Sequence, residues 1–335
     1  MVAGRFLDPK NDFCFKQIFG TEKNKDILIH FLNDILEYKD EDEIREVHFI
    51  QTIQNPDIAI YRQSTVDVMC KNQHGEQFIV EMQLGKHKGF EKRAQLYAAK
   101  AYSKQVLEED EDHKDMAVYA KLKGVIFVAI ANFIMYKKKK GWKSKHNLLD
   151  VDTLENDLKD FKFVFIELPK FNKTLKESKT LEEKWLYFFK HAKESTLAEI
   201  EHLIGKDIII KRAFEAVDQA SWTEAELNTY EQITKARLDS IAIEQQKLEE
   251  AKAEGEAIGI EKGIEKGKAE GKAEGEAIGI EKGIEKGKAE GKAEGESIAV
   301  TKTAINMLKE NIDVKLISTV TGLTEDEVLK LKSKL

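Results

Sequence analysis

The chain has 335 residues, which at roughly 100–200 residues per domain allows two or three domains and at least one sizeable core. Lys and Arg number 54 against 61 Asp and Glu, and the formal net charge of −7 excludes a protein that binds nucleic acid over its whole surface. Charged residues make up 34% of the sequence, above the usual quarter, which indicates that part of the chain is solvated helix.

The cysteines indicate a reducing compartment, and the hydropathy pattern indicates a protein outside the membrane. Cys14 and Cys70 lie far apart and lack the spacing of a disulfide scaffold or a zinc site. The longest mostly apolar run covers residues 124–135 and is too short to span a bilayer. Residues 1–20 contain no basic stretch followed by an apolar one, as an export signal would. We therefore predict a cytoplasmic protein with no membrane partner.

The first predicted elements are a helix and a β-hairpin. Apolar residues recur at three- and four-residue spacing over 27–36, which predicts an amphipathic helix. Residues 64–70 and 76–83 each alternate between apolar and polar side chains, and turn-forming residues at 72–75 separate them. This pattern predicts two antiparallel strands joined by a tight turn.

Strand alternation sets the two faces of this hairpin. On the first strand Val66 and Val68 share the apolar face, which leaves Asp67 on the other. On the second strand Glu81 and Gln83 lie together on the face opposite to the apolar one. The alternatives for this polar face are solvated surface and a functional site.

The register of the hairpin decides whether the two acids meet. With Lys71 opposite Gln77 across the turn, Asp67 falls opposite Glu81. Directly opposed Cβ atoms lie about 4.5–5.5 Å apart, so the two carboxylates would converge and repel each other. A bound Mg²⁺ or Mn²⁺ would offset this repulsion, because hard divalent cations prefer oxygen ligands. The hairpin therefore has an arrangement suited to a metal ion.

The next segments complete an α/β pattern. Residues 89–109 return to helical periodicity. Residues 124–135 and 161–168 are rich in β-branched and aromatic side chains, as expected of buried strands. The order helix, hairpin, helix, strand, strand predicts an α/β core.

A lysine cluster follows the first of these buried strands. It contains Lys137, Lys138, Lys139 and Lys140, and Trp142, Lys143 and Lys145 follow closely. Such a cluster is a local patch for a polyanion such as DNA, in which Trp142 would stack on a base or sugar. A solvated loop is the alternative.

After residue 180 the pattern is helical, and it ends in an internal repeat. Residues 253–272 recur unchanged at 273–292, and glycine occupies every fourth position from Gly255 to Gly295. Glycine costs about 1 kcal/mol relative to alanine in a helix, so an isolated helix here would be weak. The alternatives are a helix that packs closely on a partner helix and a flexible spacer.

Ordinary helical periodicity returns over residues 298–335. A turn containing Gly322, with Thr324 as the expected N-cap of the following helix, resembles the turn of a helix-turn-helix unit. A DNA-reading unit would carry a basic second helix, and this one is neutral to acidic. The composition favours a module for protein contact or oligomerisation.

Three segments in order resemble a known family. The pattern Asp67 with Glu81-Met-Gln83, the segment 11–20 and the segment 93–97 resemble the PD-(D/E)XK nuclease core, in its recombination-promoting nuclease and transposase branch. The resemblance covers residues 8–170. It implies a restriction-endonuclease-like α/β fold, in which helices flank a small mixed sheet. It also implies a Mg²⁺- or Mn²⁺-dependent DNA endonuclease that promotes recombination or belongs to a mobile element.

The resemblance also assigns ligands. It implies that Asp67, Glu81 and the backbone carbonyl of Met82 bind the metal ion. Asp12, in the first matching segment, is either an accessory acid near the metal or the cap of its helix.

The same resemblance leaves one departure in the catalytic residues. Gln83 stands where the superfamily has lysine, so it can only orient groups through hydrogen bonds. Arg93 is the preferred source of the missing positive charge, because its guanidinium can bind phosphate through two hydrogen bonds. Lys86 and Lys88 are the alternatives.

The predicted organisation has four parts. A PD-(D/E)XK-like core covers 1–172, a helical extension 173–250, a glycine-repeat linker or helix 251–297, and a helical module 298–335. The C-terminal region is expected to hold a second copy of the chain or a partner helix. The alternative is a catalytically inactive DNA-binding or oligomerising protein that keeps the nuclease fold. Gln83 in place of the superfamily's lysine is the residue that supports this alternative.

Overall fold

The computed structural model describes residues 4–54, 64–109, 117–205 and 207–335. Its contacts divide the chain into two compact units, one ending at Ile241 and the other beginning at Ala242. The first unit contains every residue of the predicted site. Among the described helices, none is both long and apolar enough to cross a membrane.

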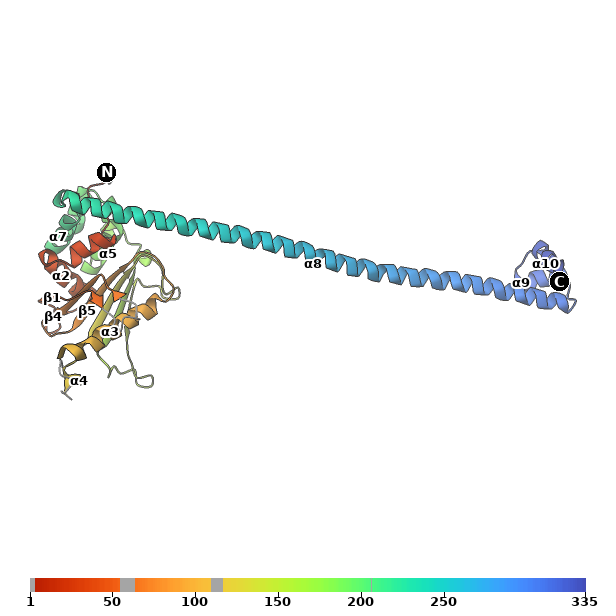
Figure 1. Ribbon diagram of the computed structural model, residues 1–335, viewed down its shortest axis with the longest axis horizontal. Helices are drawn as coiled ribbons and strands as arrows, with labels where there is room; N and C mark the ends of the chain where they lie inside the picture. The colour runs from red at the N-terminus through yellow and green to blue at the C-terminus, as the bar shows by residue number, and fades with distance from the viewer. Residues whose placement is uncertain (1–3, 55–63, 110–116, 206) are drawn as a thin grey trace. The chain divides into compact units, whose positions relative to one another are not determined.

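A mixed six-stranded sheet forms the centre of the first unit (Figure 1). Its strands are β1 (Val47–Phe49), β4 (Val68–Asn72), β5 (Gln77–Gln83), β6 (Val125–Ala131), β7 (Lys143–Asn147) and β8 (Phe161–Glu167). In space they follow the order β1-β4-β5-β6-β8-β7, with β5, β6 and β8 parallel and the other neighbours antiparallel. Two short strands, β2 (Ile53–Gln54) and β3 (Ser64–Thr65), pair separately.

Helices cover both faces of this sheet (Figure 1). The helices of the first unit are α1 (Asp12–Phe19), α2 (Lys25–Leu36), α3 (Phe90–Glu109), α4 (Val118–Lys121), α5 (Leu181–His191), α6 (Leu197–Ile204), α7 (Ile208–Ala216) and the start of α8 (Glu224–Lys309). Helices α1, α2, α5 and α7 share one core with the sheet, and α3 packs on the opposite face. The predicted α/β pattern is confirmed, including the helix over 89–109 and both buried strands.

Strand β6 explains why its sequence is a continuous apolar run. All seven of its residues are buried. Ile126 and Val128 face the core shared with α1 and α2, whereas Phe127 and Ala129 face α3. A central parallel strand covered on both faces has no solvated side, so it contains no polar alternation.

The predicted hairpin forms with the predicted register. Lys71 pairs with Gln77 and Val68 with Val80. The Asn72 side chain organises the turn, because its Oδ1 accepts hydrogen bonds from the N–H groups of His74 and Glu76, each at 3.0 Å. Gly75 has a φ of 84°, which suits a residue without a Cβ.

The predicted face of Val66 is wrong. Val68 lies in the core shared with α1 and α2, but Val66 packs with Met69 and Ile79 on the α3 side. The chain bends at Asp67, and Val66 donates its N–H to the carbonyl of Thr52 instead of continuing the hairpin ladder. This bend interrupts the strict alternation on which the prediction rests.

Helix α1 begins one residue earlier than a cap at Asp12 would place it. Asn11 is the N-cap, and its Oδ1 accepts from the N–H groups of Phe13 at 3.0 Å and Cys14 at 3.3 Å. Asp12 is therefore the first helical residue, and the alternative that it caps the helix is wrong. Its side chain is half exposed and pairs with Lys16.

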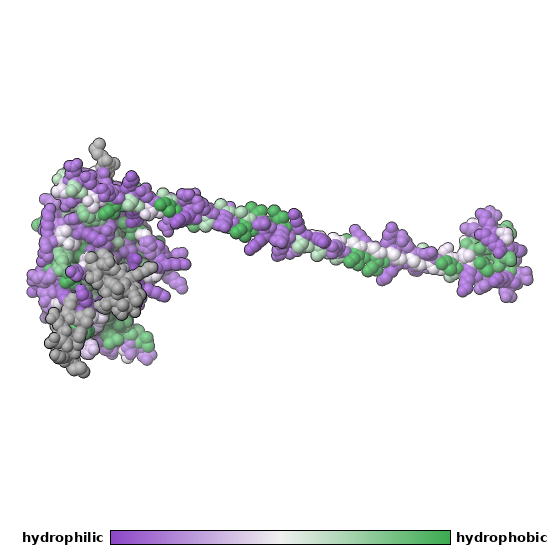
Figure 2. Space-filling model, viewed as in Figure 1, coloured by the Kyte–Doolittle hydropathy of each residue, from purple (hydrophilic) through white to green (hydrophobic). Residues whose placement is uncertain are grey.

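The second unit consists of the rest of α8 with α9 (Val314–Thr321) and α10 (Glu325–Lys332). The glycine repeat lies within α8, an 86-residue helix. Its surface is mostly hydrophilic, with apolar patches (Figure 2), and isoleucines such as Ile260 and Ile280 are exposed. A small core of Ala304, Leu308, Ile317 and Val328 joins the end of α8 to α9 and α10. Thr324 caps α10 as predicted.

Candidate active site

Asp67 and Glu81 meet where the hairpin ladder ends. The N–H of Asp67 donates to Glu81 Oε1 at 3.2 Å, and the N–H of Met82 donates to Asp67 Oδ2 at 2.9 Å. Asp67 precedes the first residue of β4, so these side-chain acceptors take the place of ladder hydrogen bonds. Glu81 is only 3% exposed. The structure thus brings the two predicted acids together with Met82.

Burial and proximity change the acidity of this pair. Burial raises the pKa of Asp67 above its usual range, and the nearby negative charge of Asp12 adds to that effect. Burial likewise raises the pKa of Glu81, with a second contribution from the charge of Asp67. Neither carboxylate gains enough from its hydrogen bonds to cancel the cost of leaving water. A cation between them would restore the ionised forms.

Gln83 and Arg93 extend the pair into a hydrogen-bonded chain. Gln83 Nε2 donates to Glu81 Oε2 at 2.9 Å, while its Oε1 accepts from Arg93 Nη2 at 2.8 Å. Arg93 comes from the first turns of α3, and its guanidinium lies over the rings of Phe90 and Tyr97. Its Nε is buried without a hydrogen-bond partner. The four predicted catalytic residues are therefore contiguous.

Lys16 is a site residue that the sequence did not predict. Its Nζ lies 3.4 Å from Asp67 Oδ1 and 3.1 Å from Asp12 Oδ2, so it links the predicted accessory acid to the pair. The two carboxylates raise the pKa of Lys16 against the opposing effect of burial, so it stays protonated. The signal available in the sequence is the four-residue spacing of Asp12 and Lys16 on one helix face.

The donor set suits a hard divalent cation. Mg²⁺ is usually held by one or two carboxylates and keeps several waters. The Met82 N–H points towards Asp67, and the N–H and C=O of one strand residue point to the same side, so the Met82 carbonyl faces the pair as well. In the described part of the chain no three His, Cys, Asp or Glu side chains cluster as a metal site. The carboxylates of Asp67 and Glu81 and the carbonyl of Met82 are therefore the protein groups available to bind a cation.

The remaining predicted cations lie outside this chain of contacts. Lys86 is exposed and its Nζ lies 3.5 Å from the carbonyl of Ile134. Lys88 is also exposed. Lys137, Lys138, Lys139 and Lys140 are exposed in the loop before β7.

Trp142 packs within the protein. Its ring meets Phe171 edge to face with centroids 5.4 Å apart, and its indole N–H donates to Glu182 at 3.0 Å. Lys173 lies over the same ring. These contacts give Trp142 a structural role at the start of β7, and its stacking on DNA stays a prediction.

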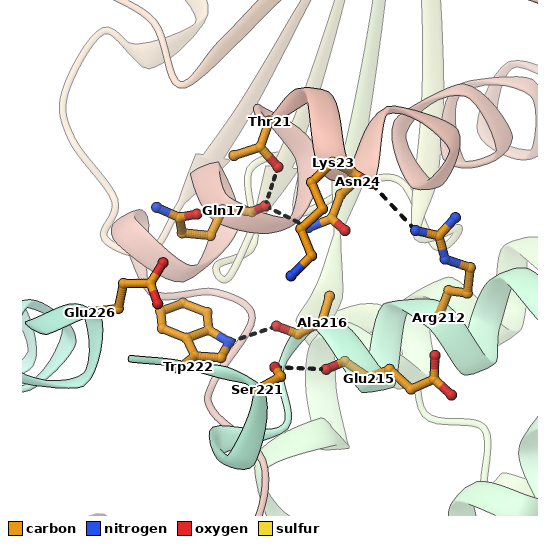
Figure 3. A pocket seen from close by; sticks show the side chains of 10 residues that line it. All are labelled: Gln17, Thr21, Lys23, Asn24, Arg212, Glu215, Ala216, Ser221, Trp222 and Glu226. Carbon is orange, nitrogen blue, oxygen red and sulfur yellow. Dashed lines mark hydrogen bonds between the residues drawn. The ribbon is translucent and has the colours of Figure 1, made fainter. Parts of the chain in front are cut away.

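A cavity of about 340 Å³ lies apart from these residues, between the α1–α2 connection and the α7–α8 connection (Figure 3). Its polar side chains bond to nearby backbone: Trp222 Nε1 donates to the carbonyl of Ala216 at 2.8 Å, and Thr21 and Asn24 both donate to the carbonyl of Gln17. None of the predicted site residues lines it. Its polar groups stabilise the helix connections.

Comparisons with known proteins agree with the resemblance. The sequence model of one family, described as PD-(D/E)XK nuclease family transposase, matches residues 9–247. That match includes the whole sheet, every residue of the site and the first part of α8. No curated protein and no solved structure matches the chain. The match extends over more than half of the chain, and the chain therefore belongs to the PD-(D/E)XK nuclease family of transposases.

Proposed function

We propose that this chain is a Mg²⁺- or Mn²⁺-dependent DNA endonuclease that hydrolyses phosphodiester bonds, in recombination or as part of a mobile element. The observation that carries the proposal is the buried Asp67–Glu81 pair, joined by hydrogen bonds at the end of β5 in a chain of this nuclease family. Asp67, Glu81 and the Met82 carbonyl would hold the cation. When bound, the cation polarises the scissile phosphate and lowers the pKa of its water.

The surrounding residues position the pair and balance its charge. The backbone N–H of Asp67 holds Glu81, and the N–H of Met82 holds Asp67, so both carboxylates have fixed orientations before DNA arrives. Gln83 keeps Arg93 beside Glu81. The Arg93 guanidinium is the group of the site suited to bind a phosphate oxygen, because a guanidinium can donate two hydrogen bonds to one phosphate.

Lys16 supplies the second positive charge of the site. Asp12, Asp67 and Glu81 offer three carboxylates against the cations Lys16 and Arg93, which leaves the site acidic when all are ionised. An acidic site attracts a divalent cation and repels DNA until the cation is present. The positive charge of Lys16 therefore reduces the repulsion between the acidic site and DNA but does not cancel it.

Cleavage of supercoiled plasmid by the full chain tests this function. Nicking is expected with Mg²⁺ and absent with EDTA. Asp67→Asn and Glu81→Gln keep the size of each side chain but remove an anionic ligand, so cleavage should fall by at least a hundredfold. Glu43→Gln is the matched control, because it removes an exposed carboxylate that lies between α2 and β1 and pairs with Arg45.

DNA binding separates this function from its alternative. Binding in EDTA should survive or tighten in Asp67→Asn and Glu81→Gln, because negative charge near the phosphates is lost. If wild type and Glu81→Gln nick plasmid at the same rate, the activity belongs to a contaminant. The chain is then a catalytically inactive protein that binds DNA or oligomerises.

A further inference from the structure

A second cavity lies on the α3 face of the sheet. It has a volume of about 210 Å³. Glu91 and Gln95 line it on α3, and the other lining residues are Tyr136, His146, Asn147, Leu148, Phe163 and Phe165. None of the predicted site residues lines it. Nothing in the nuclease proposal uses it, although it shares α3 with Arg93.

Aromatic rings form its walls in a geometry suited to a flat ligand. The Tyr136 and His146 rings are 5.4 Å apart and tilted by 39°. Phe165 meets each of them edge on, at 5.9 Å and 5.5 Å. Phe163 is only partly buried, so part of its apolar side chain remains accessible. An aromatic heterocycle inserted here would stack as bases stack on aromatic side chains.

The charges around the cavity point to a neutral ring attached to an anion. Burial raises the pKa of the Tyr136 phenol, and the nearby negative charges of Glu91 and Glu167 add to that effect, so a phosphate would be repelled inside. At the rim, Lys139 lies 4.9 Å above the Tyr136 ring and 3.4 Å from His146 Nε2. Its exposed neighbours Lys138 and Lys140 continue this positive edge. A nucleotide matches both features, with its base inside and its phosphate outside.

The acceptors on α3 give the cavity a preference among bases. A carboxylate accepts hydrogen bonds from the exocyclic amino group of cytosine, and thymine has no such group. The Gln95 amide donates to the carbonyl of Glu91 at 3.2 Å, which leaves its Oε1 as a further acceptor. Both side chains therefore favour a base with an exocyclic amino group, which offers two N–H donors, over thymine, whose only donor is its ring N3–H.

We propose that this cavity binds one unpaired base of the DNA strand, with preference for bases that carry an amino group, while Lys137–Lys140 contact its phosphates. The inference rests on the proposed function in taking DNA as the ligand. Successive residues of a helix are 100° apart, so Arg93 lies on a different side of α3 from Glu91 and Gln95. A strand that reaches both sites would cross α3, a distance of about 10 Å.

Binding of fluorescent single-stranded oligonucleotides to the full chain in EDTA tests the inference. Gln95→Trp fills the cavity from an exposed position of α3 and leaves the core untouched. Leu96→Trp places the same ring on the same helix at a position that does not line the cavity, and is the matched control. Gln95→Trp should weaken binding about tenfold, the effect of losing one base stack, and Leu96→Trp should leave it unchanged.

Two further arms identify the ligand. An abasic oligonucleotide should bind wild type and Gln95→Trp equally, because it has no base to insert. Wild type should bind an oligocytidine more tightly than an oligothymidine, and Glu91→Gln should reduce that difference. Equal binding of Gln95→Trp and Leu96→Trp, or equal binding of intact and abasic DNA by wild type, overturns the inference.

The result of this binding test can be distinguished from the result of the plasmid-nicking test of the nuclease proposal. Absence of Mg²⁺-dependent nicking together with Gln95-sensitive base binding would refute the nuclease and support the base site. Nicking together with binding that is insensitive to Gln95→Trp would do the reverse.

Discussion

Asp67 acquires its position from the place where one strand stops pairing. The ladder between β4 and β5 begins at Val68, so Asp67 keeps a backbone N–H that must find another acceptor. Glu81 provides it with a carboxylate oxygen, and the N–H of Met82 returns a bond to Asp67. Two acids that repel each other are thereby held together by backbone donors.

The raised pKa values of this pair make stability depend on pH. Burial raises the pKa of both Asp67 and Glu81, so the folded chain binds protons more tightly than the unfolded chain at these sites. The two carboxyl groups contribute their full stabilisation below the pKa of about 4 that they have in the unfolded chain. This contribution is lost as the pH rises through their higher pKa values in the folded chain. A pKa that is one unit higher in the folded chain corresponds to about 1.4 kcal/mol in the free energy of unfolding.

In EDTA we expect the Tm of wild type to fall relative to that of Asp67→Asn as the pH rises from about 5 to 8. The reason is that the variant has one ionisable group fewer to leave buried and charged. Thermal unfolding followed by circular dichroism measures the difference, and Mg²⁺ should reduce it. Parallel curves for the two proteins would contradict the prediction, and Glu43→Gln should follow wild type.

Gln83 is matched to Arg93, so restoring the lysine of the superfamily should not by itself help. Gln83→Lys removes the acceptor of Arg93 Nη2 and places a cation beside the guanidinium. We expect Gln83→Lys to nick plasmid at least tenfold more slowly than wild type, and Gln83→Lys with Arg93→Gln to recover part of that loss. Additive losses in this double-mutant cycle would show that the two residues act independently.

For single residues, the sequence predicts a pair within one hairpin and misses pairs between segments that are joined only by tertiary packing. The meeting of Asp67 and Glu81 follows from hairpin register, which the turn and the hydrophobic pattern determine. Lys16 reaches Asp67 only because α1 packs beside the bend, and no local pattern records that packing. The Gln83–Arg93 contact similarly depends on how α3 lies on the sheet.

At the scale of elements, the central strands were predictable and the edge strands were not. β6 and β8 bury apolar runs that stand out in the sequence. β1 has three residues, and β7 reads Lys-Ser-Lys-His-Asn, which is polar almost throughout. Edge strands are commonly short or lysine-bearing, which limits pairing with other chains and also conceals them from hydrophobic pattern analysis.

Strand β7 divides the lysine cluster into two groups. Lys143 Nζ lies 2.7 Å from Glu37 and 2.8 Å from Glu182, and Lys145 pairs with Glu37 at 2.9 Å. The two lysines lower the pKa of Glu37 to about 2. The exposed lysines from Lys137 to Lys140 are thus the part of the cluster that we propose contacts DNA.

Replacing Lys137–Lys140 by alanine should weaken DNA binding and flatten its dependence on salt. Each phosphate contact that is lost removes about one unit from the slope of log affinity against log salt. Anisotropy titrations at several salt concentrations measure this slope.

Lys143→Ala is the informative comparison. It should lower the Tm, because Glu182 and Glu37 lose a partner, and it should leave the salt slope near that of wild type. A quadruple variant with an unchanged slope would assign the cluster to solvated loop.

At the scale of the whole molecule, α8 presents a helix built from unfavourable residues. At each of its eleven repeat glycines, from Gly255 to Gly295, a Cβ would meet nothing within 4 Å. Lys–Glu pairs four residues apart, such as Lys266 with Glu270 at 3.6 Å, compensate by only a few tenths of a kcal/mol each. We propose that the C-terminal region holds a second copy of the chain, for which glycine permits close approach.

Alanine at Gly267, Gly271 and Gly275 tests this proposal. In a lone helix each change should add stability, about 1 kcal/mol relative to glycine, and far-ultraviolet circular dichroism should show more helix. If a second copy packs on these positions, the added methyl groups should instead weaken self-association in sedimentation equilibrium at unchanged or higher helix content. Greater helicity with unaltered association would assign the repeat to a spacer.

The turn from Asn72 to Glu76 has a consequence that reaches the other end of the hairpin. Surface turns usually accept an inserted or deleted residue with little harm. Here a change of one residue would shift every opposed pair by one, and Asp67 would then face Val80 or Met82 in place of Glu81. The length of the turn, more than its composition, therefore keeps Asp67 opposite Glu81.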